Sequence, residues 1–182
     1  MEGAVAWIGK LAEWLGSFIP RWVILDTTEA GIKYVRGQPC YCAPGQIHWY
    51  WPVTTVLGTY PVVRQTDRLE TQTLESSDGK TFMVSGTLTY CVDDIMKLVP
   101  TTHLPLIAVV EIAGTALHDV LCDLSWEEIQ AHQRKNTLKT RLKNEAQRSL
   151  TEYGVTVLQF KLNTLARCRV FKVSQTTASE EN

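Results

Sequence analysis

Residues 4–19 place apolar side chains at the spacing of an amphipathic helix. At about 100° per residue, the large apolar side chains fall on one continuous arc. This arc contains Ala4, Trp7, Ile8, Leu11, Trp14, Leu15 and Phe18. The opposite side carries Gly9, Lys10, Glu13, Gly16 and Ser17. The pattern predicts one helix with a wide apolar face.

This helix suits a membrane interface better than a membrane crossing. Its apolar run is shorter than the roughly 20 residues that a spanning helix needs, and Lys10 and Glu13 interrupt it. Two indole rings fit the headgroup level, where an apolar body and one N–H donor both find partners. We therefore predict a membrane-interface segment over residues 1–21. The residues predicted to contact lipid are Trp7, Ile8, Leu11, Trp14, Leu15, Phe18 and Trp22. The alternative interpretation is a helix that packs its apolar face on the protein's own core.

From Trp22 to Val92 short β-prone runs alternate with turn signals. The apolar patch over residues 19–25, which contains the helix-ending Pro20, either deepens membrane insertion or starts the first strand. The clearest hairpin joins residues 69–75 to residues 81–92 across Asp78 and Gly79. In its second strand one face is apolar and the other mostly polar, which is typical of a half-buried strand. The apolar face is formed by Phe82, Val84, Gly86, Leu88, Tyr90 and Val92.

After Asp93 the apolar period changes to that of helices. We expect a short helix over residues 95–99 that stops at Pro100, and an apolar helix over residues 104–121 that begins near Pro105. Ser125 and Glu128 form a capping box, which opens a long helix to about residue 153. Gly154 is the stop signal, a strand over residues 155–162 follows, and residues 174–182 form a frayed polar tail.

The composition limits the cellular compartment and the partners that we expect. The chain of 182 residues has 45% hydrophobic residues and a formal net charge of -1. It can build one substantial core or two small subdomains, and no global field favours nucleic acid. Its five cysteines are an odd number scattered through apparent strands and helices. A reducing, cytosol-facing compartment fits them better than a secreted disulfide framework does.

The order of motifs resembles the SPFH family of stomatin, prohibitin and flotillin-like membrane scaffolds. The resemblance runs from about Glu29 to Leu162. Its pieces are AGIKYVRG at residues 30–37, APGQIHW at 43–49, Pro52, SDG at 77–79, Val84, Gly86 and Leu88, YCVD at 90–93, LSWEEI at 124–129, and YGVTV at 153–157. The motif residues that we single out are Gly37, Pro44, Gly45, Asp78, Gly79, Tyr90, Asp93, Ser125, Glu128 and Gly154. Asp93 is expected to cap the helix that follows its strand.

The resemblance implies an elongated α/β (α+β) fold with a mainly antiparallel N-terminal sheet, a helical second half and a final strand. We place this SPFH-like domain at residues 22–173, with subdomains at about 22–92 and 93–173. It implies a non-catalytic scaffold with no cofactor, held on the cytoplasmic side of a membrane. Its partners would be membrane lipids, further copies of itself and other membrane proteins that it organises.

One departure bears on assembly. Such proteins usually continue into a long coiled coil after the last strand, whereas no heptad run precedes Asn182. We therefore expect either weak self-association or dependence on another subunit for the assembly element.

Three constellations offer other chemistry. Cys40 and Cys42 flank Tyr41 in an expected turn with His48 nearby, which suggests zinc or lipidation, although a fourth metal ligand is not apparent. His118 and Cys122 would share a helix face, so the alternative function is a soluble thiol-dependent enzyme. An inert cysteine in an apolar stripe is the stronger interpretation of Cys122.

The third constellation is a basic stretch over residues 132–148, with a single acid, Glu145, among six basic residues. These are Arg134, Lys135, Lys139, Arg141, Lys143 and Arg148. Such a face could contact anionic lipid, pair with acids on a neighbouring subunit or remain solvated. Nucleic acid is the poorest option, because aromatic residues for base stacking are not interleaved with the charges.

Overall fold

The computed structural model describes residues 10, 14, 16 and 19–168. Lys10, Trp14 and Gly16 are helical, in agreement with the predicted N-terminal helix. The other predicted lipid contacts of that helix, and the polar tail, lie outside the described residues. These contacts are Trp7, Ile8, Leu11, Leu15 and Phe18.

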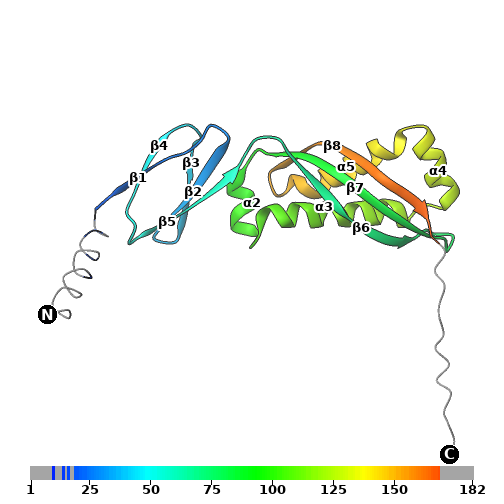
Figure 1. Cartoon of the computed structure of the whole chain (residues 1–182), viewed down its shortest axis with the longest axis horizontal. Helices are drawn as coiled ribbons and strands as arrows, with labels where there is room; N and C mark the ends of the chain where they lie inside the picture. The colour runs from blue at the N-terminus through cyan, green and yellow to red at the C-terminus, as the bar shows by residue number, and fades with distance from the viewer. Residues whose placement is uncertain (1–9, 11–13, 15, 17–18, 169–182) are drawn as a thin grey trace, which may run out of the picture.

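The described chain is an elongated α+β structure, as the resemblance implies (Figure 1). Its strands and helices follow one another in the order β1 (Arg21–Ile24), β2 (Glu29–Val35), β3 (Gln38–Cys42), β4 (Ile47–Tyr50), β5 (Thr55–Pro61), β6 (Gln65–Glu75), β7 (Thr81–Val92), α2 (Ile95–Thr101), α3 (Pro105–Cys122), α4 (Trp126–Arg134), α5 (Thr137–Thr151) and β8 (Val155–Arg167). The strands form three antiparallel sheets, β1-β4, β3-β2-β5 and β6-β7-β8. The first two sheets occupy the end near the N-terminus, and the third lies with the helices at the other end (Figure 1).

The main core lies between the third sheet and helices α3 and α5. The predicted hairpin is confirmed as β6 and β7, and every second residue of β7 from Phe82 to Val92 is buried. Facing it, α5 buries the predicted stripe of Leu138, Leu142, Ala146 and Leu150. The alternation of β7 therefore points its apolar face at the helices, as a half-buried strand requires.

Helix α3 is a core helix despite its apolar composition. It is long and apolar enough to cross a membrane, but 44% of it is buried inside the protein. It packs on α5 and on β6, and Pro105 is its first residue, where a missing N–H costs no hydrogen bond. Its hydrophobicity is therefore used for packing within the fold.

A smaller core joins the first two sheets. Leu25, directly after β1, and Cys42 on β3 are both fully buried. Gly31 lies between them, and an added Cβ there would sit 3.1 Å from both the Leu25 Cδ1 and the Cys42 Cβ atoms. This close packing holds the β1-β4 sheet against the β3-β2-β5 sheet.

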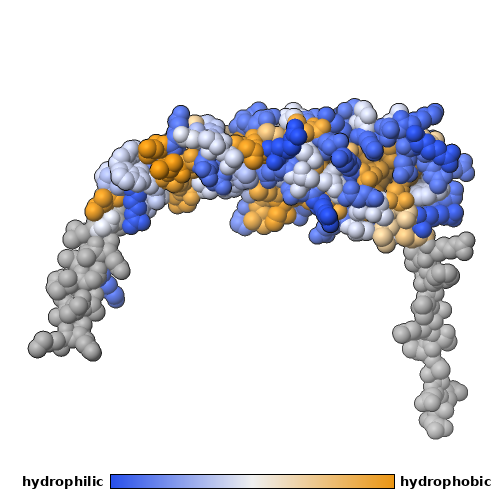
Figure 2. Space-filling model, turned by 45° about the horizontal axis from the view of Figure 1, so that its top comes forward, coloured by the Kyte–Doolittle hydropathy of each residue, from blue (hydrophilic) through white to orange (hydrophobic). Residues whose placement is uncertain are grey.

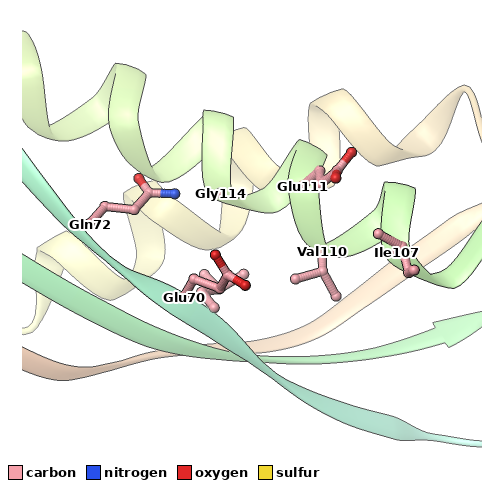
Figure 3. Close-up of a pocket in the computed structure, with 7 residues that line it drawn as sticks. Glu70, Gln72, Ile107, Val110, Glu111 and Gly114 are labelled. Atoms are coloured by element: carbon pink, nitrogen blue, oxygen red, sulfur yellow. The ribbon is translucent and has the colours of Figure 1, made fainter.

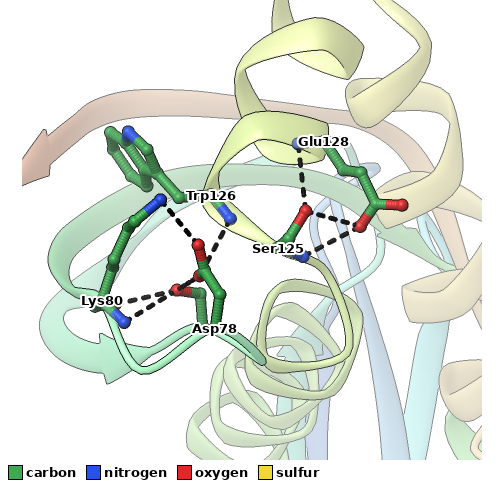
Figure 4. Close-up of polar contacts among 6 residues, drawn as sticks. Asp78, Lys80, Ser125, Trp126 and Glu128 are labelled. Carbon is green, nitrogen blue, oxygen red and sulfur yellow. Dashed lines mark hydrogen bonds and ion pairs between the residues drawn. The ribbon is translucent and has the colours of Figure 1, made fainter.

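The turn between β6 and β7 is tied to the start of α4 (Figure 4). Ser125 caps α4, and Glu128 bonds back to it in the predicted capping box. Asp78 accepts hydrogen bonds from the Ser76 hydroxyl and the Trp126 backbone N–H, and pairs with Lys80 at 2.7 Å. These donors hold the pKa of the Asp78 carboxyl well below its usual range, the contact with Lys80 contributing most. The hairpin is thereby fixed to the helical layer.

Gly154 joins α5 to β8 at a crowded position. Its φ is +69°, a left-handed conformation, and an added Cβ would lie 2.7 Å from the Asp94 carbonyl oxygen. Gly37, Gly45 and Gly79 also have positive φ, and each lies in a turn between strands. Pro44 precedes Gly45 in its turn.

The structure corrects the predicted helix boundaries. Helix α2 does not stop at Pro100 but continues to Thr101, because the hydroxyls of Thr101 and Thr102 donate to the Leu98 carbonyl in its last turn. The expected long helix is divided into α4 and α5 at Asn136, whose φ of 56° is left-handed. Asparagine tolerates that conformation better than most residues do.

Two further predictions near β8 are also corrected. The residue that caps α2 is Asp94, whose side chain accepts from the Met96 N–H at 3.0 Å. Asp93 accepts instead from the Thr156 hydroxyl on β8. Strand β8 continues past Leu162 to Arg167, because β7 is long enough to pair with it throughout.

The start of β8 is covered by a side chain from α5. The Gln147 amide donates to the Val155 carbonyl at 3.2 Å and accepts from the Val157 N–H at 2.6 Å. Among the strands that the structure describes, β8 pairs with β7 alone. Gln147 thus supplies, over three residues, the backbone partners that another strand would offer.

Candidate membrane-facing surface

Strands β1 and β4 turn their large apolar side chains outward. In the register of this pair Trp22 lies opposite Trp49, and Ile24 lies opposite Ile47. Directly opposed residues share a face, and so do residues two apart along a strand. All four are therefore on one face, with exposed fractions of 66%, 57%, 71% and 61% in that order. We call these four residues the tryptophan face.

The tryptophan face is ordered by its own aromatic contact. The rings of Trp22 and Trp49 lie edge to face, with centroids 5.3 Å apart and an interplanar angle of 75°. Pro20 and Arg21 complete a shallow hollow beside them. Such aromatic pairs contribute about 0.5–1.5 kcal/mol beyond their buried area. The two rings therefore form one rigid apolar projection.

More exposed apolar residues surround this face. Trp51 and Val53 follow β4, and Ile19 and Trp14 precede β1; all four are large and exposed. Figure 2 shows apolar residues at the end of the molecule that carries β1 and β4, besides further apolar patches on the rest of this face. Surfaces of this kind mark contact sites with proteins, ligands or membranes.

The opposite side of the β1-β4 sheet is anchored to the fold. Val23 and His48 lie opposite each other on that side and are half-buried. The His48 ring nitrogen Nε2 is 3.0 Å from the Ala43 carbonyl oxygen, which ties β4 to the preceding turn. Contacts on the opposite side of the β1-β4 sheet therefore fix the position of the tryptophan face.

Of the predicted lipid contacts, the structure describes Trp14 and Trp22, and both are exposed near this end. Ile24, Ile47 and Trp49 were not among the predicted contacts. Their pairing joins segments about 25 residues apart, which no local period reveals. The signal that could have found them is the apolar character of residues 47, 49 and 51, which share one side of an expected strand.

The thiol constellation lacks the features of a nucleophile. Burial, and then the nearby Asp119 and Asp123 carboxylates, raise the pKa of the Cys122 thiol, whereas a thiolate nucleophile needs a lowered one. His118 is exposed and contacts Asp119 at 3.2 Å. No hydrogen bond within the described chain joins it to Cys122. The two residues share α3, and the ring of His118 contacts Asp119 instead of Cys122.

Cys40 and Cys42 lie on strand β3 and not in a turn as expected. The turn signals around them mark the ends of this strand. Burial raises the pKa of the Cys42 thiol. In the part of the chain that the structure describes, His, Cys, Asp and Glu side chains form no group of three that could hold a metal ion.

Comparison with known proteins assigns the family. The SPFH domain / Band 7 family matches residues 23–174, which is most of the chain. A search of curated proteins finds no match. The matched region contains the last two residues of β1, strands β2–β8 and helices α2–α5. The chain therefore belongs to the SPFH domain / Band 7 family.

Proposed function

We propose that the protein is a scaffold of stomatin and prohibitin type that binds a membrane surface, self-associates there and organises lipids or partner membrane proteins. The family is generally non-catalytic and typically membrane-associated. The observation that carries the proposal is the tryptophan face, which adjoins the predicted N-terminal helix. Together they would give one continuous apolar contact with the lipid interface.

The chemistry of this end of the chain supports interfacial binding. Indole and aliphatic side chains gain about 25 cal/mol for each Å² of apolar surface removed from water. Arg21 is exposed between the N-terminal helix and the tryptophan face, where it can approach lipid phosphates. We place the scaffold at the cytoplasmic side of the membrane, because all five cysteines are free thiols.

The test is flotation of the full-length protein with vesicles of phosphatidylcholine and phosphatidylserine. We expect wild-type protein to float. The double variant Trp22→Ser/Trp49→Ser should bind at least about ten-fold more weakly, because it lacks the two indole rings that would enter the lipid interface. A chain lacking residues 1–20 should also bind more weakly. The matched controls are Tyr41→Ser and Val56→Ser, which remove exposed apolar side chains elsewhere.

The outcomes distinguish binding through the tryptophan face from binding through any exposed apolar residue. Equal losses in the control variants would show that any exposed apolar residue suffices, which would overturn the role of the tryptophan face. Wild-type protein that stays at the bottom of the gradient would overturn membrane binding itself. Circular dichroism of each variant confirms that the fold is retained.

A further inference from the structure

Charges in the second half of the molecule are divided between two sides of one sheet. Helix α3 and strand β6 together contain five acidic residues and one basic residue. Helix α5 and strand β8 together contain six basic residues and one acidic residue. We call α3 with β6 the acidic flank, and β8 with the face of α5 that carries Lys139 and Lys143 the basic flank.

The two flanks lie at opposite edges of the β6-β7-β8 sheet. β7 is the central strand, so β6 and β8 are its outer strands. Helix α3 packs on β6 and α5 packs on β8, while the two helices contact each other between them. Each flank is therefore a lateral surface with its own strand and helix.

The acidic flank contains a hollow between its strand and its helix. Figure 3 shows Glu70 from β6 and Glu111 from α3 bordering this hollow, whose volume is about 180 Å³. Both glutamates are exposed. Ile107 and Val110 line the same hollow, so the flank combines negative charge with apolar surface.

The basic flank also has a hollow between its strand and its helix. Lys139, Lys143 and Gln147 follow one another at every fourth residue of α5 and so form one ridge. Gln147 touches the backbone of β8, which shows that this ridge runs along the strand. Lys139 and Lys143 line a hollow of about 380 Å³ beside Leu158 and Phe160.

These charges have no ion-pair partner within the described part of the chain. The ion pairs found there involve other residues, and none includes Glu70, Glu111, Lys139 or Lys143. β8 itself contains no acid. A two-fold contact between two basic flanks would therefore bring like charges together, whereas an acidic flank fits a basic one.

We propose that the partner of each flank is a second copy of this chain, with the acidic flank of one copy docked on the basic flank of the next. This contact rests on the self-association proposed above and names its surfaces. It is a head-to-tail contact, so it can continue from copy to copy into a ring or row. If the axis of such a ring is normal to the membrane, every copy turns its tryptophan face toward that membrane.

The test reverses the charge of each flank in turn. With Glu70→Lys/Glu111→Lys the hollows of both flanks are bordered by lysines, and with Lys139→Glu/Lys143→Glu the hollows of both flanks are bordered by glutamates. Full-length protein is placed on a supported bilayer of phosphatidylcholine and phosphatidylserine, and the mass of the bound particles is measured by mass photometry over the same series of surface densities for each variant. Each double variant alone should need at least about ten-fold higher surface density to associate.

Mixing the two double variants should restore association, because every contact can again join opposite charges. The matched control is Arg148→Glu, which makes a charge reversal on the far side of α5, about 180° around the helix from Lys139. This control should associate like the wild type. Raising the salt concentration should weaken the wild-type contact, as screening of exposed charges requires.

The failures of the two proposals are distinguishable. Bound wild-type protein that remains a single subunit at every density overturns self-association and flank pairing together, and leaves membrane binding standing. Oligomers that survive both reversals, or a mixture that stays unassociated, overturn flank pairing alone. An equal loss in Arg148→Glu would assign the effect to net charge, and would also overturn it.

Discussion

The first and third sheets of this protein use the same strand alternation in opposite ways. In β7 every second residue from Phe82 to Val92 faces the helices and is buried. In the β1-β4 pair the large apolar side chains face outward. In the view of Figure 2 the strongly hydrophilic residues lie mainly on the half with the helices, and hydrophobic patches occur on both halves.

This difference indicates that the third sheet stabilises the fold and that the β1-β4 sheet is free to contact a partner. The third sheet holds the fold together, because its apolar face is shielded from water on folding. The tryptophan face gains nothing comparable within one chain, so its apolar side chains are available to a partner surface. Mutations in the two sheets should therefore have different effects, and four predictions test this.

The largest effect is expected at Phe82. This residue is fully buried and its ring lies 5.7 Å from that of Trp126. Phe82→Ala should lower the free energy of unfolding by about 3–5 kcal/mol, measured by urea denaturation. A loss below about 1 kcal/mol would contradict the assignment of β7 to the main core.

A second large effect is expected at Gly154. Gly154→Ala must adopt positive φ and also meets the Asp94 carbonyl, so a loss of about 2–3 kcal/mol is expected in the same measurement. Gly37→Ala is the matched control. Its φ is +83° but nothing lies within 4 Å of the added Cβ, so only about 1 kcal/mol should be lost. Equal losses would show that crowding at Asp94 does not matter.

A smaller, pH-dependent effect is expected at Asp78. Its pKa is lower in the folded protein than in the unfolded chain, so its ionised form stabilises the fold at pH values above the usual aspartate range. Wild type should therefore have a higher Tm than Asp78→Asn above about pH 4, and the difference should shrink as the pH falls further. A difference in Tm that stays constant down to pH 2 would contradict this account.

The smallest effect on stability is expected at the tryptophan face. Trp49→Ser removes an exposed ring and one edge-to-face contact, so it should change the free energy of unfolding by about 1 kcal/mol or less. Urea denaturation checks this value. A loss as large as that of Phe82→Ala would mean that the tryptophan face is part of the core.

Features set by neighbouring residues were predictable from the sequence. The alternation of β7, the β6-β7 hairpin, the capping box at Ser125 and the first turn of α3 at Pro105 depend on local backbone and side-chain geometry. The motifs that carry the family resemblance are of the same local kind. These parts of the fold could be read directly from spacing.

Features set by tertiary contacts were not predictable from the sequence. The division of α4 from α5 depends on one left-handed asparagine, which helix periodicity does not register. The choice of Asp94 over Asp93 as cap follows from where β8 places Thr156. The tryptophan face needs the pairing of β1 with β4, so three of its four residues were not predicted as lipid contacts.

The Gln147 amide has a consequence for crowded assemblies. Exposed strand edges tend to zip together into continuous β-structure, as in amyloid, when many copies are concentrated. Gln147 fills the hydrogen-bonding groups of Val155 and Val157 that an incoming strand would need. An incoming strand therefore cannot pair with this first part of β8 unless the Gln147 side chain moves away.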